Sequence, residues 1–343
     1  MLKLRQILKQ NPISYSVLIF WLLVSFSSFI IEFKAHAIDL GSTLLRPFSI
    51  KHCLGTDDLG RDILSCLIVG SQYVWVIGLG VCFFSGVGGI LLGTGIALLS
   101  YFYKKIPIRY ALVGGVLAWL VMIIMIEQTR HPNLWKQLWT LIVVGGLIIF
   151  LNKLLGKFTK EDNFMNKPLE IPFPILFNYL ISLHGAVPGL VIALIISTFV
   201  FSGIISVIII LSLVAWIPFA RVSYFVAQHQ LRQPYSEAVQ VLGIPTWRAL
   251  WRHFLPGIMP QLITPLMQTF VFSILTEATL SFLGFGLSAE KITWGGMLSS
   301  ARNIPSAWWL AVFPIAALLS LSAAMLHIAE SFDQRDISTK KKY

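Results

Sequence analysis

Charged residues are scarce in this sequence. Asp, Glu, Lys and Arg make up 12% of its 343 residues, whereas a soluble domain carries about 25%. Hydrophobic residues make up 56%, and the mean hydropathy is +0.79. One buried core does not account for so much apolar sequence, so lipid must be the solvent for much of the surface. We therefore predict an all-α, polytopic transmembrane helical bundle and exclude a soluble two-domain protein.

Motifs of soluble enzymes and metal proteins are also absent. The sequence has no GxxxxGK[ST] loop for ATP, no HExxH and no GxSxG. Cys53, Cys66 and Cys82 form no CxxC pair and no Cys/His cluster, so we expect no metal site. Whether Cys53 and Cys66 form a disulfide stays open, because it depends on which side their loop faces. These absences predict a chain that is not an enzyme and binds no cofactor itself.

Acidic residues are outnumbered by basic ones, and the net charge is +11. In a soluble protein this excess would indicate nucleic acid binding. Here Lys and Arg lie in short loops beside apolar runs, which is typical of membrane orientation. We expect membrane lipid and no nucleic acid among the partners.

Eight segments are long and apolar enough to cross a bilayer, which takes about 20 residues. They lie at 13–31, 72–103, 108–127, 135–156, 174–200, 203–222, 258–286 and 307–329. We expect the first to be an uncleaved helix. A very short connection predicts a tight hairpin of the fifth and sixth, and Pro188 interrupts the fifth. Gly89 and Gly93 share one face of the second, where a neighbouring helix can approach closely.

The distribution of Lys and Arg predicts the orientation. With the N-terminus in the cytoplasm, 18 of the 26 Lys and Arg lie on the inner side and 8 on the outer side, as the positive-inside rule requires. Both termini are then cytoplasmic. We divide the chain into an N-terminal helix with its external segment (1–71), a transmembrane domain (72–335) and a cytoplasmic tail (336–343).

The longest cytoplasmic connection, residues 223–256, has a pattern of its own. Gly243 suits a helix end, because glycine readily adopts the left-handed conformation there. Pro245 suits the first turn of a second helix, which Leu255-Pro256 ends. Two short helices at a glycine corner form an elbow that can dock in a groove of a partner. A helix lying along the membrane surface is the alternative.

The same loop resembles the EAA motif of ABC-importer permeases, which is Glu-Ala-Ala, three residues, Gly, nine residues and Ile-x-Leu-Pro. The sequence reads EAVQVLG followed after nine residues by HFLP. Histidine at the isoleucine position resembles the dipeptide, oligopeptide and nickel branch. In the family this loop couples the pore to the ATPases. The resemblance implies that role for Glu237, Ala238, Val239, Gly243, Leu255 and Pro256.

Two further stretches resemble the C-type permease of the same branch. Residues 52–72 read HCLGTDDLGRDILSCLIVGSQ and resemble HPLGTDxxGRDxLSRLLYGAR. Residues 276–302 read TEATLSFLGFGLSAEKITWGGMLSSAR and resemble EASLSFLGLG…SWGxML. The resemblance implies a type I ABC-importer permease core, with 72–335 as its permease domain. The chain departs from the family by an inserted helix pair at about 104–171, which keeps the EAA loop cytoplasmic.

The resemblance also implies partners. They are a second, B-type permease, one or two ABC ATPase subunits that bind ATP and Mg, and an extracytoplasmic substrate-binding protein, all at the bacterial cytoplasmic (inner) membrane. The chain would form half of the translocation pore of a peptide importer. Import of nickel or a metal chelate is the alternative. An ion-coupled secondary transporter is the alternative from another class, but the internal repeat usual in such proteins is not found.

Single polar residues add three further hypotheses. Glu277, Ser281 and His184 are candidates for the pore or gate, because polar groups at membrane depth usually face a cavity or a partner; packing within the bundle is the alternative. The external cluster is a candidate contact for the binding protein, with ion pairing and helix capping as the alternative; its residues are Asp57, Asp58, Arg61 and Asp62. Trp294, Trp308 and Trp309 fit an aromatic belt.

Overall fold

The structure is a computed structural model. It describes residues 11–31, 33, 35–49, 51–102, 105–107, 168–170, 173–199, 203–233, 248, 252, 255–288 and 290–340. Nearly all of its regular structure is helical, which confirms the predicted fold class. The chain forms two compact units, residues 1–97 with 179–343, and residues 98–178.

Three helical runs in the described residues are long and apolar enough to cross a membrane. They are α3 (Ile63–Phe102), the run of α12 (Leu255–Ile258), η3 (Met259–Leu262) and α13 (Ile263–Leu283), and α15 (Trp309–Lys340). Two bent helix pairs bring the number to five if each is one span, and α2 (Pro12–Ile30) is apolar but shorter. The protein therefore has a multi-pass transmembrane fold. The predicted spans 108–127 and 135–156 lie outside the described residues.

Both bent pairs break at a proline. α6 (Phe173–Gly185) and α7 (Gly189–Ser197) meet at 74°, and Pro188 is the N-cap of α7. α8 (Ile204–Ala215) and α9 (Ile217–Leu231) meet at 45°, with Pro218 in the first turn of α9. Proline lacks an N–H and clashes with the preceding turn, so it ends or bends a helix. The predicted break at Pro188 is confirmed, whereas α9 continues well past the predicted end at residue 222.

A small two-stranded sheet departs from the all-helical prediction. β1 (Lys105–Pro107) pairs antiparallel with β2 (Pro168–Glu170), and Lys105 lies opposite Glu170. The strands lie at the two ends of the segment at about 104–171 that the sequence analysis predicts to be inserted. They place its start and its return side by side.

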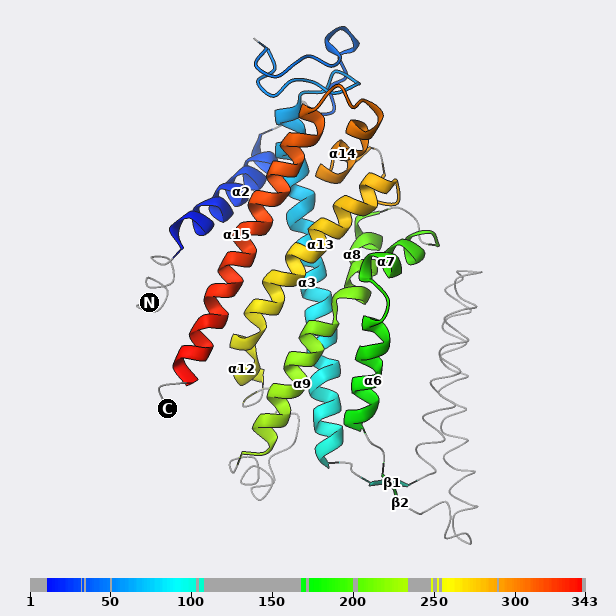
Figure 1. The fold of residues 1–343 in the computed structure, drawn as a ribbon, viewed down its shortest axis with the longest axis vertical. Helices are drawn as coiled ribbons and strands as arrows, with labels where there is room; N and C mark the ends of the chain where they lie inside the picture. Colours follow the sequence, from blue (N-terminus) through cyan, green and yellow to red (C-terminus); the bar gives the residue numbers. More distant parts are fainter. Residues whose placement is uncertain are drawn as a thin grey trace. The chain divides into compact units, whose positions relative to one another are not determined.

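The helices of the larger unit pack around α13. It contacts α15 and α14 (Trp294–Asn303), and α15 in turn contacts α2; Figure 1 shows α2, α15 and α13 in this order. Three side-chain hydrogen bonds join α2 to α15, and such bonds are worth about 1 kcal/mol each between helices in lipid. They are Asn11 to Ser331, Ser14 to His327 at 2.8 Å, and Trp21 to Ser320 at 3.0 Å. A single-turn helix, η1 (Leu40–Ser42), lies in the segment between α2 and α3.

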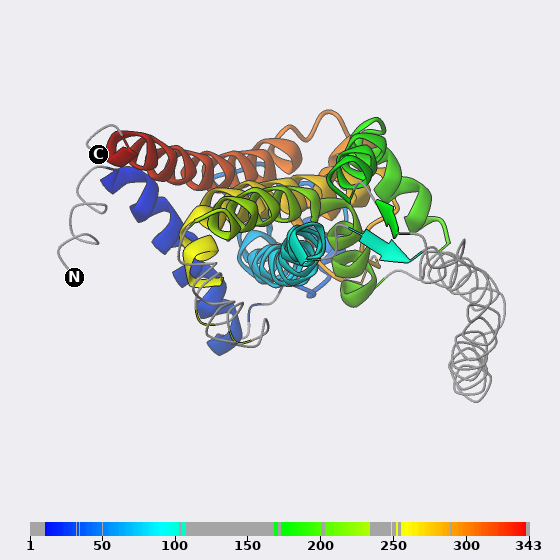
Figure 2. The same ribbon diagram turned by 90° about the horizontal axis from the view of Figure 1, so that it is seen from below.

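The close approach expected at Gly89 and Gly93 is confirmed. A Cβ on Gly89 would lie 2.5 Å from the Trp216 carbonyl oxygen, and one on Gly93 would lie 2.2 Å from the Ala220 carbonyl oxygen. Both distances are far inside van der Waals contact, so α9 rests on the bare backbone of α3. Figure 2 shows α3 and α9 next to each other.

Adding a methyl group at this crossing should destabilise the bundle. We expect Gly93→Ala to lower the free energy of unfolding by about 1–3 kcal/mol, because the backbone of α9 must move away. Thermal unfolding of the full-length chain in detergent measures this. Gly95→Ala is the matched control, since nothing lies within 4 Å of its Cβ position. Equal unfolding temperatures for the two variants would contradict the close packing.

Candidate functional site

Two glycines and a buried threonine fix the segment before α3. Gly55 and Gly60 have φ of 85° and 73°, a region that suits glycine and strains other residues. A Cβ on Gly60 would lie 1.9 Å from the Asp39 carbonyl oxygen. The Thr56 side chain is buried, and its hydroxyl donates to the Ser42 carbonyl oxygen at 2.6 Å. This segment is therefore a built scaffold and not a loose external loop.

Asp57 and Arg61 of the predicted external cluster form an ion pair inside this scaffold. The Arg61 Nε donates to the Asp57 carboxylate at 2.6 Å. The other carboxylate oxygen accepts the backbone N–H groups of Arg61 and Leu59 at 2.8 and 3.0 Å. Asp57 is only 4% exposed. Its charge is thus satisfied within the chain.

Asp62 caps the start of α3. Its carboxylate accepts the backbone N–H of Ser65 at 2.9 Å and the Ser65 hydroxyl at 2.8 Å. The other carboxylate oxygen lies 3.1 Å from Nδ1 of His52. Asp58, by contrast, is exposed. Ion pairing and capping therefore account for three members of the cluster and leave Asp58 accessible.

The second family-like stretch forms the end of α13 and the start of α14. α13 ends at Gly284, which adopts the left-handed conformation with φ 88°. Thr293 caps α14 by accepting the Gly296 N–H at 3.0 Å. Glu277 is 4% exposed and accepts the Ser281 hydroxyl at 2.7 Å, and Thr293 is a second hydrogen-bond partner. The Glu277 carboxyl group therefore has both of its hydrogen-bond partners, Ser281 and Thr293, within this chain. A role of Glu277 in the pore or gate stays a prediction.

The two stretches dock on each other through tryptophan side chains. The Trp294 indole N–H donates to the Leu67 carbonyl oxygen at 3.0 Å, and the Trp309 indole N–H donates to the Thr56 carbonyl oxygen at 3.1 Å. A Cβ on Gly70 would lie 2.8 Å from the Trp294 ring. Residues more than 200 positions apart in the sequence thus form one structure at this end of the bundle, which we call the cavity end.

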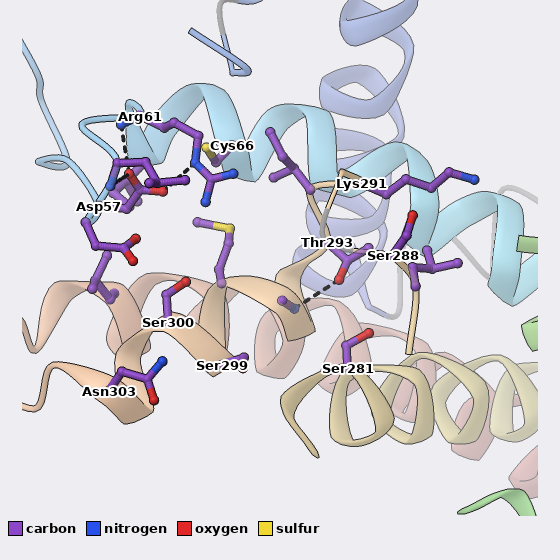
Figure 3. Close-up of a pocket in the computed structure, with 18 of the residues that line it drawn as sticks. Asp57, Arg61, Cys66, Ser281, Ser288, Lys291, Thr293, Ser299, Ser300 and Asn303 are labelled. Atoms are coloured by element: carbon purple, nitrogen blue, oxygen red, sulfur yellow. Dashed lines mark hydrogen bonds and ion pairs between the residues drawn. The ribbon is translucent and has the colours of Figure 1, made fainter. Parts of the chain in front are cut away.

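A polar cavity of about 380 Å³ lies between the docked stretches. Figure 3 shows Arg61 on one wall, and Ser300 and Asn303 on the facing wall. Its charged and polar lining residues are Asp57, Asp58, Arg61, Ser281, Ser288, Lys291, Thr293, Ser299, Ser300 and Asn303. The cavity thus joins Ser281 to three members of the predicted external cluster. It offers hydrogen-bonding groups and charges of both signs to a polar ligand or partner.

His184 lies apart from this cavity. Its ring packs edge-on against Trp216, with centroids 5.9 Å apart. Its Nε2 is buried and has no hydrogen-bond partner among the described residues. It lines a different cavity, of about 390 Å³, with residues of α8, α9 and α13. The structure does not bring His184 together with Glu277 and Ser281.

The ends of the expected coupling loop lie at the other end of the bundle (Figure 1). Leu255 and Pro256 begin α12; Glu237, Ala238, Val239 and Gly243 lie outside the described residues. α9 and α12, which flank the loop, pack against each other. A Cβ on Gly257 would lie 1.9 Å from the Gln230 side-chain nitrogen. The loop therefore leaves and re-enters the bundle at neighbouring points.

The structure answers one open question, on the cysteines, and corrects one expectation, on the tryptophans. Cys53 is exposed and Cys66 is buried, and both are free, so no disulfide joins them. The Cys66 thiol points to the Ala35 carbonyl oxygen, 3.8 Å away. Trp294 and Trp309 are 1% and 5% exposed and are core residues, because their N–H groups have backbone acceptors inside the fold. Only Trp308 of the three, 54% exposed, fits an aromatic belt.

Thr56 and Gly70 were missed by the sequence analysis. Both lie in the first family-like stretch, and each contacts a tryptophan of the second half of the chain. The Thr56 carbonyl oxygen accepts the Trp309 indole N–H, and Gly70 leaves room for the Trp294 ring. The glycines around Thr56 were the sequence feature that could have indicated a tightly packed segment here. Among the described residues no group of three or more His, Cys, Asp or Glu could hold a metal ion.

Comparison with known proteins assigns the C-terminal half of the chain to a family. Residues 173–336 match the family described as binding-protein-dependent transport system inner membrane component. This region runs from α6 to α15. It includes the second family-like stretch and the expected coupling loop.

Several permeases are similar to most of the chain. The probable D,D-dipeptide transport system permease protein of Escherichia coli is 27% identical over 322 residues, 92% of this chain and 84% of that protein. The di/tripeptide transport system permease protein of Pseudomonas aeruginosa is 28% identical over 275 residues, 80% of this chain and 68% of that protein. The glutathione transport system permease protein of Pectobacterium atrosepticum is 24% identical over 271 residues, 79% of this chain and 67% of that protein.

These matches confirm the resemblance found in the sequence and do not favour an ion-coupled carrier. Residues 173–336 form a domain of the binding-protein-dependent transport system inner membrane component family, and the chain as a whole is a multi-pass membrane protein similar to the permeases of peptide-type ABC importers.

Proposed function

We propose that this chain forms half of the translocation pore of a bacterial inner-membrane importer for short peptides, beside a B-type permease. One or two ABC ATPase subunits bind ATP and Mg on the cytoplasmic side, and an extracytoplasmic binding protein delivers the substrate. The family description, which names binding-protein-dependent transport, supports that last partner. The substrates in the names of similar permeases, dipeptides and tripeptides, favour peptides over nickel or a metal chelate.

The observation that carries the proposal is the path from the coupling loop to the cavity. α12, η3 and α13 run without interruption from Leu255 to Leu283. One end of this run packs on α9 at the loop, and the other end carries Ser281 on the cavity wall. A helix is stiff along its axis because each turn is hydrogen-bonded to the next. A push on the loop therefore reaches the cavity end as a movement of α13.

In this mechanism Glu237 pairs with the ATPase groove and Gly243 forms the corner of the elbow. Closure of the ATPases on ATP moves the elbow, and α13 moves with it. The cavity end then opens or closes toward the binding protein. This is alternating access driven from outside the chain, so the permease itself contributes no catalytic group.

Changes in the elbow should abolish transport and leave insertion intact. We expect Glu237→Lys and Gly243→Pro to lower uptake of a labelled dipeptide by at least about tenfold in cells that express the whole transporter, because a reversed charge or a lost corner disrupts docking. Co-purification of the ATPase reports docking directly. Glu330→Lys, a charge reversal at an exposed site on α15, is the control. Normal uptake in both elbow variants would contradict the coupling role.

The external cluster offers a test that separates scaffold from contact. We expect Asp57→Asn to lower the free energy of unfolding by about 1–3 kcal/mol, because Arg61 loses its partner. Asp58→Asn should change stability by less than about 0.5 kcal/mol but weaken capture of the binding protein a few-fold at low salt. Thermal unfolding and binding-protein affinity measure the two effects. Unchanged affinity in Asp58→Asn would remove this residue from the contact.

A further inference from the structure

A third cavity opens on the side of the bundle, where α13, α14 and α15 meet. It encloses about 670 Å³, within the range of about 300–1,000 Å³ typical of ligand pockets. Ala278 and Leu318 form a buried floor, and Leu275 and Ile315 form exposed walls. Its lining is almost wholly apolar, unlike that of the polar cavity between the docked stretches. We call it the lateral groove.

One cation stands at the mouth of the lateral groove. Arg302 lies in the last turn of α14 and is exposed. Its guanidinium carbon is 5.6 Å from the centroid of the Phe282 ring, which also lines the groove. Among the described residues no carboxylate lies within ion-pair distance of Arg302. The charge thus stands over an apolar groove with no anion of its own.

The height of Arg302 in the bundle fits the membrane interface. Trp308 directly precedes α15, is 54% exposed, and packs near Trp309 and Phe313. Exposed tryptophans of membrane proteins gather where headgroups meet acyl chains. α14 ends at the same end of α13 and α15 (Figure 1). Below Arg302, the groove therefore faces the acyl region.

We propose that the lateral groove binds a phospholipid, with the phosphate on Arg302 and the start of one acyl chain along Leu275, Ala278 and Ile315. Arginine binds phosphate through several N–H donors at once. The apolar lining suits a methylene chain. Burial of each CH₂ group is favourable by about 0.8 kcal/mol relative to water, but it gives no net free energy relative to the apolar interior of the bilayer. Specificity therefore comes from the headgroup.

The shape of the groove favours a lipid over a helix of a partner subunit. On α15 the lining runs from Ala311 to Leu318, about 10 Å along the axis. A spanning helix crosses a bilayer core of about 30 Å, so this lining would cover only about a third of its length. α14 also bounds the groove at one end. The groove matches the upper part of an acyl chain in length, whereas a spanning helix would leave most of its surface outside it.

A photoreactive lipid tests the proposal. The full-length chain is placed in phosphatidylcholine nanodiscs that contain phosphatidylglycerol with a diazirine in its acyl chain, and adducts are located by peptide mass spectrometry. We expect adducts within residues 275–282 and 311–318. Arg302→Gln should lower their yield about five- to tenfold. Ala311→Phe, which fills the groove and keeps the charge, should lower it as well.

Matched controls separate the groove from general attraction to the membrane. Lys51→Gln removes one exposed positive charge outside the groove and should leave the yield unchanged. A diacylglycerol probe, which lacks the phosphate, should label the wild type no better than it labels Arg302→Gln. Equal labelling of wild type and Arg302→Gln by phosphatidylglycerol would overturn the proposal. So would loss of the adducts when the whole transporter is assembled, because a neighbouring subunit would then occupy the groove.

Discussion

The hydrogen bond from the Trp294 indole to the Leu67 carbonyl oxygen holds the cavity end together. The indole sits over Gly70, where any side chain would collide with it, and packs edge-on against Trp21 with centroids 4.8 Å apart. One ring thereby fixes α14 to α3 and to α2. Thr293, the preceding residue, caps α14 and meets Glu277. A buried N–H without an acceptor costs about 1–3 kcal/mol, so separating α14 from α3 at this point would carry that cost.

Much of the helical framework could be predicted from the sequence, because span length and proline placement are local properties. Pro188 ended a helix as expected, and the apolar runs became α2, α3, α13 and α15. The start of α3 was placed at residue 72, whereas Asp62 caps the helix ten residues earlier. α14 was missed, because an amphipathic helix of ten residues carries no spanning signal. Short polar helices depend on what they pack against, which composition does not report.

The residues of the candidate site were found by motif, but their roles were less predictable. Motif spacing identified Asp57, Arg61 and Asp62 without distinguishing a charge that binds a partner from a charge that builds the fold. The structure assigns these three to ion pairing and capping. The same limit applies to Trp294 and Cys66, whose burial depends on contacts with distant segments. Family motifs in this protein therefore mark a shared architecture first, and only Asp58 of the cluster remains free to face outward.

The short ladder between Lys105 and Glu170 has a bearing on how such a chain evolves. Paired strands lie about 5 Å apart, so a segment of more than sixty residues begins and returns at nearly one point. An inserted segment whose two ends adjoin would leave the spacing of the flanking helices unchanged. Such a segment could then be added or removed without rearranging the rest of the bundle.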